Sequence, residues 1–546
     1  MNEIPKNLLN RACGPLTDMP ANGPSPTLAP DGASAHSISL IKLPVMAAGT
    51  AALQFAHPSS AVGVNIMLIG LGPHADRTYV PHIAELRALG LNVHLRVVAE
   101  LESARAAVSA RTKKHGPNQP DDMVFIAPTC PYAMDAKTEI VLNRLVAKHQ
   151  INAVIVSTPP EAHFAYADWG LRNGISVLLD KPVTSRPNAV SSREAARGIR
   201  EDIRLLIARY RETKKRHRIC CVVNAQRRFH RLFDFMRKMV EEVRDITGHA
   251  VTRISAAHGD GQFRLPSELI DIAYHGYRGG NGKLSHSGYH LADMICRLFA
   301  AGWTDESKPS HMLVQSSFVQ PDALLMNMPR DRFLQLFGER YNEYSHYSDE
   351  ELSQVASRMG EVDANISMEF LRKGRLTATA SMDLQHNTVS ARSWLEPGEN
   401  LYKMNGRMKR EFWRVDSGPF QSIRLETIQA EDKHDGPGVK GIGIGQPNHL
   451  QIAVVRNEKL LGTGKRLEII SGSELRDDNT KLHSERAKMA ALSEFIDFVQ
   501  GKIAHEELTS DLQDHLLSAS VMSAAYESHV LRQQRGTGAG WIKLKL

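Results

Sequence analysis

The chain has 546 residues, of which 42% are hydrophobic and 23% are charged, with 67 Lys and Arg against 60 Asp and Glu. This composition excludes a wholly disordered chain, and the length indicates at least two domains. No apolar run approaches the ~20 residues of a membrane-spanning helix. The five cysteines form no C-x-x-C pair, which argues against a disulfide framework or a cysteine zinc site. Without the pattern of a signal peptide, a cytoplasmic protein is expected.

Three regions follow one another along the chain. Residues 1–62 are rich in Pro, Ala, Gly and Ser, so we expect a disordered or weakly ordered extension. Over 63–226, short apolar runs alternate with helical patterns, which predicts a Rossmann domain with a doubly wound parallel sheet. Over 227–546, strand candidates alternate apolar and polar residues, which predicts a C-terminal α/β domain with a largely antiparallel open sheet. Residues 304–360 are expected to be a partly helical insertion.

The individual elements can be placed in chain order from hydrophobic periodicity. Expected strands of the first domain are 64–69, 93–99, 123–127, 153–156, 175–179 and 219–223, and expected helices are 137–149, 161–173 and 189–217. Expected elements of the second domain are strands 251–257, 365–371 and 376–383 and a helix over 485–499.

A glycine loop follows the first expected strand. Residues 70–75 read GLGPHA and match the pattern G-x-G-x-x-A. Gly70 would allow a tight turn, and Gly72 would let the backbone approach a pyrophosphate at the N-terminus of the next helix. Alone this motif is weak, but its position between a strand and a helix strengthens it.

Glu100 ends the second expected strand. A carboxylate there would bind the ribose hydroxyls of NAD and repel a 2′-phosphate. NAD is therefore favoured as the cofactor. NADP stays the alternative, because 30 residues separate Gly70 from Glu100 instead of the usual ~20. A second glycine run, 441–445, opens no helix and is expected to be a loop rather than a nucleotide site.

His286, His290 and Asp293 form the densest group of chemically active residues. Their i, i+4, i+7 spacing puts them on one helix face if a helix begins near His286. Acid–base catalysis is one interpretation, because imidazole titrates near neutral pH. Zinc ligation is a second, and an ordinary buried helix face is a third.

These motifs and several others together resemble the glucose–fructose oxidoreductase and inositol dehydrogenase family (Gfo/Idh/MocA), over about residues 64–532. Thr158, Pro159 and His163 resemble a family motif beside the cofactor. Residues 180–182, DKP, resemble the family's EKP. Residues 280–293 resemble its catalytic segment, in which His290 takes the place of the acid–base histidine.

The resemblance implies an NAD(P)-dependent oxidoreductase that transfers hydride between nicotinamide and a secondary alcohol or ketone of a sugar-, polyol- or nucleotide-sugar-like substrate. It assigns catalytic roles to Lys181, His290 and His286 and no metal. The expected cofactor-binding residues are Gly70, Gly72, His74, Ala75, Glu100, Thr158, Pro159, His163, Lys181 and Pro182. Weaker candidates for substrate binding are Arg228, His275, Tyr289 and Asp293.

One departure from the family pattern concerns His286, which stands where the family has aspartate. This change could alter substrate choice, for example toward an anionic or acylated group, or mark the loss of redox chemistry. Two alternatives therefore stay open. One is an enzyme of the same fold that cleaves glycosides with no net redox change, and the other is a nucleotide-binding regulatory protein with a decayed catalytic set.

The positive charge is concentrated in one segment. Residues 186–244 hold 17 Lys and Arg against 7 Asp and Glu. Aromatic residues are sparse there and acids are interspersed, which argues against a nucleic-acid surface. The expected partners are a small-molecule substrate and, by the resemblance, a second copy of the chain in a dimer or tetramer, with no membrane.

Overall fold

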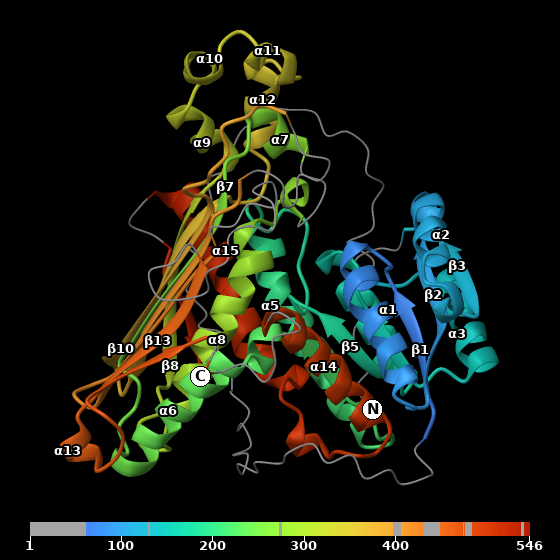
Figure 1. Cartoon of the computed structure of the whole chain (residues 1–546), viewed down its shortest axis with the longest axis horizontal. Helices are drawn as coiled ribbons and strands as arrows, with labels where there is room; N and C mark the ends of the chain where they lie inside the picture. The colour runs from blue at the N-terminus through green and yellow to red at the C-terminus, as the bar shows by residue number, and fades with distance from the viewer. Residues whose placement is uncertain are drawn as a thin grey trace, which may run out of the picture.

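The computed structural model describes residues 62–128, 132–271, 276–396, 406–429, 448–472, 474, 483–536 and 540–546. Two sheets form its framework and stand side by side, with helices between them (Figure 1). Residues 1–61 of the predicted extension, the glycine run 441–445 and the substrate candidate His275 lie outside the described residues.

The first sheet has six parallel strands in the order β3-β2-β1-β4-β5-β6. Its strands are β1 (Val64–Ile69), β2 (Val93–Leu101), β3 (Asp122–Ile126), β4 (Ala153–Val156), β5 (Ser176–Asp180) and β6 (Cys221–Asn224). The helices between them are α1 (Pro73–Ala88), α2 (Arg105–Lys113), α3 (Ala136–His149), α4 (His163–Arg172) and α5 (Arg193–Lys214). The order reverses between β1 and β4, where ligands bind in such sheets. The predicted Rossmann fold is confirmed.

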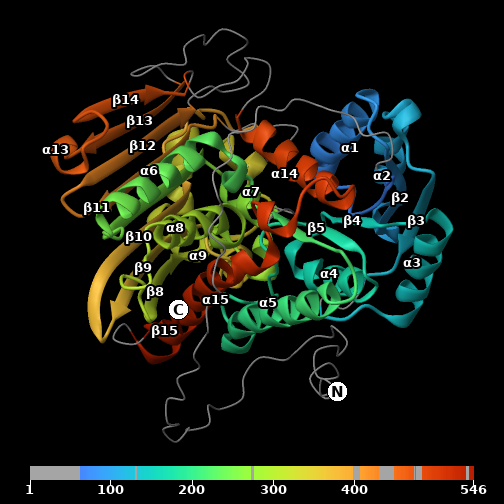
Figure 2. The ribbon, with the colours of Figure 1, turned by 90° about the horizontal axis from the view of Figure 1, so that it is seen from below.

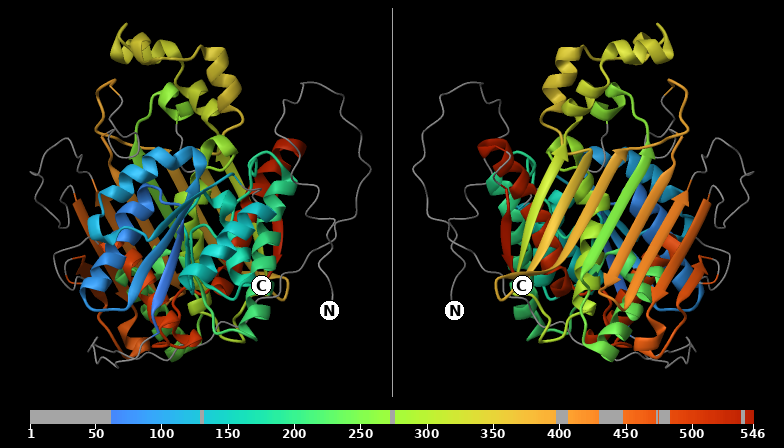
Figure 3. Two further views of the ribbon diagram at one scale, coloured as in Figure 1. Left: turned by 90° about the vertical axis from the view of Figure 1, so that its right-hand side faces the viewer. Right: turned by 90° about the vertical axis from the view of Figure 1, so that its left-hand side faces the viewer.

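The second sheet has nine strands in the order β14-β13-β12-β11-β7-β10-β9-β8-β15, and only β7 and β10 pair in parallel. Its strands are β7 (Arg253–Gln262), β8 (His311–Val319), β9 (Asp363–Arg372), β10 (Arg375–Asn387), β11 (Lys409–Ser417), β12 (Gln421–Gln429), β13 (Asn448–Arg456), β14 (Leu467–Ser471) and β15 (Ile542–Lys545). One face carries α6 (Arg231–Thr247), α8 (Tyr289–Ala301) and α15 (Leu516–Arg535), and the other lies open (Figures 2 and 3). The largely antiparallel open sheet is confirmed.

The segment 304–360 contains both a sheet strand and a helical projection. β8 lies within it and is paired with β9 and β15 as an integral strand of the second sheet. The helical part is α9 (Pro321–Asn327), α10 (Arg330–Phe337), α11 (Tyr341–Tyr344) and α12 (Asp349–Ala356). With α7 (Pro266–Asp271), these helices stand beyond one end of the sheet (Figure 1). The helical projection thus covers only residues 321–356 of the segment 304–360.

Near its C-terminus the chain returns to the first sheet. Helix α14 (His483–Val499) packs against α1 and β6. Its buried side chains Leu492, Phe495 and Ile496 join the same core as the strands of the first sheet. We therefore propose that the first folding unit combines residues 63–226 with this distant helix.

Helix α15 was not expected from the sequence, because it is rich in Ser and Ala and has no amphipathic stripe. It is buried on all sides from Leu516 to Leu531 and lies between α5 and the second sheet. Its serines bond in several directions. Ser523 donates to the Ala196 carbonyl of α5 at 2.7 Å, and Ser528 accepts from the Ser316 amide of β8 at 2.9 Å.

The basic segment 186–244 spans α5 and α6, and many of its charges are paired within the chain. Arg186 bonds Asp202 at 2.5 Å, and Arg193 bonds Glu527 at 3.0 Å. The same Glu527 carboxylate lies 3.6 Å from both Arg197 and Arg200. Among the described residues, no helix is both long and apolar enough to cross a lipid bilayer.

Replacing Phe495 with Ala tests whether α14 is part of the first core. The side chain is fully buried, so Phe495→Ala should lower the free energy of unfolding by about 3–5 kcal/mol. Ile140→Ala, at a side chain that is 51% exposed on α3, should change it by less than about 0.5 kcal/mol. Urea denaturation measures both, and equal small effects would contradict this assignment of α14.

Candidate active site

The glycine loop lies where the ends of β1 and β4 meet. Gly70 has a φ of +92°, and a Cβ there would stand 2.5 Å from the Ser157 carbonyl oxygen. Gly72 caps α1 in an extended conformation, and a Cβ there would have no described atom within 4 Å. Gly70 is therefore needed for the tight turn beside the Ser157 carbonyl, whereas Gly72 leaves open space at the N-terminus of α1. That space suits a pyrophosphate group.

Glu100 lies beside this loop in spite of its distance along the sequence. β1 and β2 pair Ile69 with Ala99, so the next residue of β2 stands at the turn. The Glu100 carboxylate accepts the amides of Leu71 at 2.9 Å and of Leu101 at 2.8 Å. The 30-residue spacing arises because α1 is a long helix of 16 residues, and the acid still reaches the position that suits ribose hydroxyls.

The end of β5 holds a partly buried acid, Asp180, next to the loop. Asp180 accepts hydrogen bonds from Ser157 Oγ at 2.6 Å and from the Tyr79 hydroxyl. His74 Nε2, from the glycine loop, lies 3.7 Å from Asp180. Burial raises the pKa of the Asp180 carboxyl, but His74 and these hydrogen bonds outweigh burial and hold it below its ordinary value. Asp180 is therefore an anion that ties β5 to α1.

His163 joins the loops that follow β4 and β5. Its ring nitrogens lie 2.8 Å from the Pro182 carbonyl and 3.0 Å from the Thr158 carbonyl. The peptide bond before Pro182 is cis. Thr158 donates its hydroxyl to the carbonyl of Pro159 at 3.2 Å. Ala75 is buried in the first turn of α1. The predicted cofactor-binding residues therefore gather at one edge of the first sheet.

Lys181 extends from this edge toward the second sheet. Its Nζ donates to the main-chain oxygen of His286 at 2.5 Å. Burial lowers the pKa of Lys181 to about 8, against the opposing charge of Asp180. The side chain keeps partial exposure. Lys181 is thus a cation that titrates close to neutral pH and remains accessible.

His290 lies in the first turn of α8 and is 7% exposed. Its Nδ1 is buried and has no hydrogen-bond partner among the described residues. Burial holds the pKa of the imidazole well below its ordinary value. Nearby cations lower it further, namely Lys181, Arg227, Lys488 and Lys409. His290 is therefore a neutral base at pH 7 that faces a group of positive charges.

His286, His290 and Asp293, which the sequence places on one face if a helix begins near His286, have different surroundings in the structure. A π-helical turn, Leu284–Gly288, carries His286 and precedes α8, which carries the other two. His286 Nε2 lies 2.8 Å from the hydroxyl of Tyr277. Among the described residues, no group of three or more His, Cys, Asp or Glu side chains is arranged to hold a metal ion.

Three of the substrate candidates are instead buried against one another or the core. Arg228 makes two hydrogen bonds to Asp293, at 2.8 and 2.7 Å. Tyr289 is fully buried, with its hydroxyl 3.1 Å from His515. The charges of Arg228 and Asp293 are therefore matched without a ligand. The neighbouring Arg227, which sequence reasoning passed over, is the arginine beside His290.

Other polar residues at the site come from β7, from β10 and from the segment before α8, and sequence reasoning gave them no role. Lys283 is fully buried and pairs with Asp260 of β7. His386 of β10 lies 3.5 Å from Asp260 and 3.3 Å from the hydroxyl of Tyr277. The only sequence signal for such residues is polar character at inward-facing positions of alternating strands, which becomes visible once the strands are registered.

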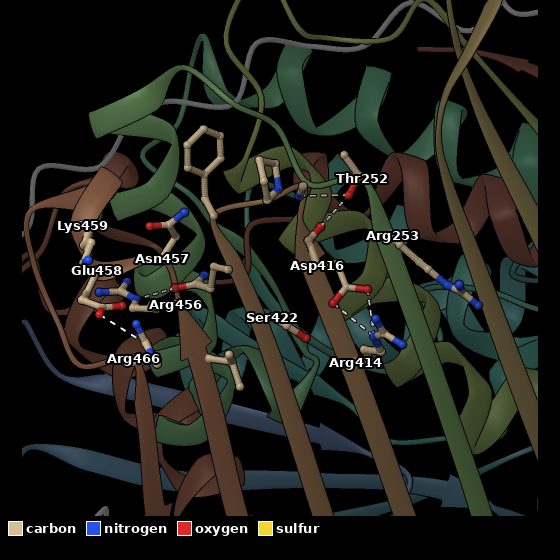
Figure 4. Close-up of a pocket in the computed structure, with 15 residues that line it drawn as sticks. Thr252, Arg253, Arg414, Asp416, Ser422, Arg456, Asn457, Glu458, Lys459 and Arg466 are labelled. Atoms are coloured by element: carbon tan, nitrogen blue, oxygen red, sulfur yellow. Dashed lines mark hydrogen bonds and ion pairs between the residues drawn. The ribbon is translucent and has the colours of Figure 1, made fainter.

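A separate hollow of about 690 Å³ lies at the opposite end of β11 and at the start of β12 (Figure 4). Charged residues line it, and several are already paired. Arg414 lies 2.8 Å from Asp416, and Arg466 lies 3.4 Å from Glu458. None of the residues predicted for the active site lines this hollow.

Comparison with known proteins agrees with this geometry. Residues 64–197 match the family model GFO_IDH_MocA, described as an oxidoreductase family with an NAD-binding Rossmann fold. Residues 64–197 thus match the NAD-binding domain of the Gfo/Idh/MocA family. No curated protein matches the sequence at a significant level. The resemblance read from the motifs is confirmed for this domain.

Solved structures resemble nearly the whole chain in fold. A levoglucosan dehydrogenase in complex with NADH and L-sorbose is 12% identical, with a TM-score of 0.51, over 88% of this chain and 98% of its own. An oxidoreductase from Agrobacterium radiobacter, in complex with NAD+, L-tartaric acid and magnesium, is 13% identical, with a TM-score of 0.50, over 89% and 98%. The WlbA dehydrogenase from Bordetella pertussis, with NADH and UDP-GlcNAcA, is 12% identical, with a TM-score of 0.50, over 89% and 99%.

The two loop glycines allow a matched test. Gly72→Ala should leave thermal stability unchanged, because its Cβ meets no described protein atom, but should weaken NAD binding by about tenfold or more through crowding of the pyrophosphate. Gly70→Ala should destabilise the protein itself, because its Cβ would clash with the Ser157 carbonyl. Thermal denaturation and calorimetric titration with NAD separate the effects. Unchanged NAD affinity in Gly72→Ala would place the pyrophosphate elsewhere.

Proposed function

We propose that the protein is an NAD-dependent oxidoreductase that transfers hydride between nicotinamide and a secondary alcohol or ketone of a sugar- or polyol-like substrate. The observation that carries the proposal is the meeting of Lys181 and His290 at the glycine-loop edge of the first sheet. Lys181 donates a hydrogen bond to the main-chain oxygen of His286, four residues before His290, and its charge lowers the pKa of the His290 imidazole. NAD is preferred because Glu100 stands at the loop as an acid.

The residues present suit the cofactor. Gly72 leaves room for the pyrophosphate, Glu100 offers carboxylate oxygens to ribose hydroxyls, and Lys181 extends past the loop. When bound, NAD supplies the acceptor or donor of the hydride. The protein has to hold the substrate carbinol, stabilise charge on its oxygen and move one proton.

Lys181 and His290 divide these tasks. In oxidation, the neutral imidazole of His290 accepts the hydroxyl proton, and in reduction it returns that proton to the carbonyl oxygen. The Lys181 ammonium donates a hydrogen bond to the same oxygen and stabilises the negative charge that develops there. His286 contributes its main-chain oxygen, which holds Nζ of Lys181 in place. The His286 ring, directed to Tyr277, orients this turn.

Removing the Lys181 ammonium should slow turnover more than it weakens binding. Lys181→Met should lower kcat by about 10²- to 10³-fold, the usual effect of losing one donor to a developing oxyanion, with NAD affinity within a few fold of the parent. Lys148→Met, at a lysine whose side chain is 62% exposed, is the matched control. Steady-state kinetics with NADH absorbance measure both, and an unchanged kcat in Lys181→Met would reject the role of Lys181.

The reaction should depend on pH through Lys181. Its pKa is lowered to about 8, so the ammonium loses its proton as pH rises through that value. In the direction of alcohol oxidation, for which His290 is already the neutral base over this range, kcat/KM should therefore fall above about pH 8. Lys181→Arg should remove this fall, whatever its absolute rate, because guanidinium stays charged. A profile that is flat in the parent protein from pH 7 to 10 would contradict a required Lys181 ammonium that loses its proton near pH 8.

His290→Asn tests the proposed base. Loss of proton transfer should lower kcat by about 10²- to 10⁴-fold, as measured by steady-state kinetics, and an unchanged kcat would reject His290 as the base.

The kind of reaction is tested on the parent enzyme. Product analysis should show one NADH formed for each carbinol oxidised. Glycoside cleavage with no net NADH would instead support transient oxidation. Retained NAD binding without turnover of any sugar, polyol or nucleotide sugar would support a regulatory protein.

A further inference from the structure

We propose that the substrate carries an oxyanion, a carboxylate or a phosphate ester, and that Arg227 and Lys409 hold this group beside His290. The inference rests on the proposed function, because it names the chemical class of the substrate of that same site. It depends on where the cationic side chains of the site lie and on which of their donors remain unpaired.

Arg227 provides the first donor. It lies in the short turn after β6 and is 7% exposed. Its Nη2 donates to Glu411 of β11 at 2.5 Å. Its Nη1 is equally buried, yet it finds no hydrogen-bond partner within the part of the chain that the structure describes. A buried guanidinium nitrogen without an acceptor is costly, and an oxyanion of the ligand would satisfy it.

Lys409 provides the second donor. It begins β11, two residues before Glu411, so both side chains lie on the same face of the sheet. That face is the one on which Trp413 and Val415 are buried. Lys409 keeps partial exposure, and no described acid forms an ion pair with it. Glu411 on the same face is the acid whose charge acts most on Lys409, but no hydrogen bond or ion pair between described residues occupies the ammonium.

The acids near these cations have other partners. Asp180 is held by Ser157 and Tyr79. Asp260 pairs with the buried Lys283. Glu411 is shared between Arg227 and the Trp413 indole N–H, the latter at 2.8 Å.

Among the described residues, the charged side chains that act most on the pKa of His290 are cations. Two of them, Lys181 and Lys409, come from different parts of the chain and keep partial exposure. Burial lowers the pKa of Lys409 to about 8; Glu411 opposes this shift, and the charges of Arg407 and Arg227 add to it. Oxidised nicotinamide would add a further positive charge. An anionic substituent would offset this repulsion, whereas a neutral polyol would not.

The guanidinium and ammonium groups suit both oxyanion classes. A carboxylate or a phosphate can accept from Arg227 Nη1 and Lys409 Nζ at once through two oxygens. The reacting carbinol would then lie between Lys181 and His290. Nothing in this arrangement distinguishes carboxylate from phosphate, so the experiment has to include both.

The test uses the full-length protein and probes in matched sets. Each set has a neutral parent, its carboxylate and its phosphate ester, as in glucose, glucuronate and glucose 6-phosphate, or N-acetylglucosamine, its uronate and its 6-phosphate. Calorimetric titration of the NAD-loaded protein measures the affinity for each probe, and NADH absorbance measures kcat/KM. We expect the preferred anion to exceed its parent in affinity by about 10- to 100-fold, the effect of one charge-assisted hydrogen bond.

Two variants and one control locate the effect. Lys409→Met should lower the ratio of anion to parent by about tenfold. Arg227→Gln combined with Glu411→Gln should lower it similarly while avoiding an unpaired buried carboxylate. Arg414→Gln, in the separate hollow of Figure 4, should leave the ratio unchanged. Thermal denaturation of each variant verifies that it folds.

The outcomes separate a failure of the anion site from a failure of the proposed function. If NAD binds and neutral parents bind or turn over as well as their anions, the anion site is rejected and the proposed function stands. If NAD does not bind, the proposed function fails, and anion binding that Lys409→Met abolishes would still support the cationic site. A preference that survives in both variants would reject Arg227 and Lys409 as its source.

Discussion

The hydrogen bond from Lys181 to the main-chain oxygen of His286 connects the two halves of the molecule at the place where chemistry is proposed. Lys181 follows the last residue of β5 in the first sheet, and His286 lies in the π-helical turn before α8 on the second. That turn is wound as a π-helix, a form that often occurs at functional sites.

Much of the first sheet was predictable from the sequence, and the reason is physical. Its strands are short apolar runs, because helices cover both faces, and the runs of β1, β2 and β5 end at a glycine or an acid. β1 was placed to the residue. The active-site edge was predictable for the same reason, since Gly70, Glu100 and Lys181 each follow such a run.

The second half was less predictable, because its residues acquire meaning only through pairing. Lys409 and Glu411 have no local motif and become neighbours of Arg227 only when β11 pairs with β7. Arg227 and Arg228 are adjacent in sequence, yet one meets Glu411 and the other Asp293. Helix α15 escaped prediction since a helix buried on every side carries no polar stripe.

The small side chains of α15 have a mechanical consequence. Ser and Ala let this helix approach α5 closely, and its serine hydroxyls replace the water that buried backbone carbonyls such as that of Ala196 would otherwise bind. Prying the two sheets apart would expose more than four turns of helix and several unsatisfied polar groups. We therefore expect the two sheets to move little relative to each other, so that any motion needed for ligand exchange takes place in loops.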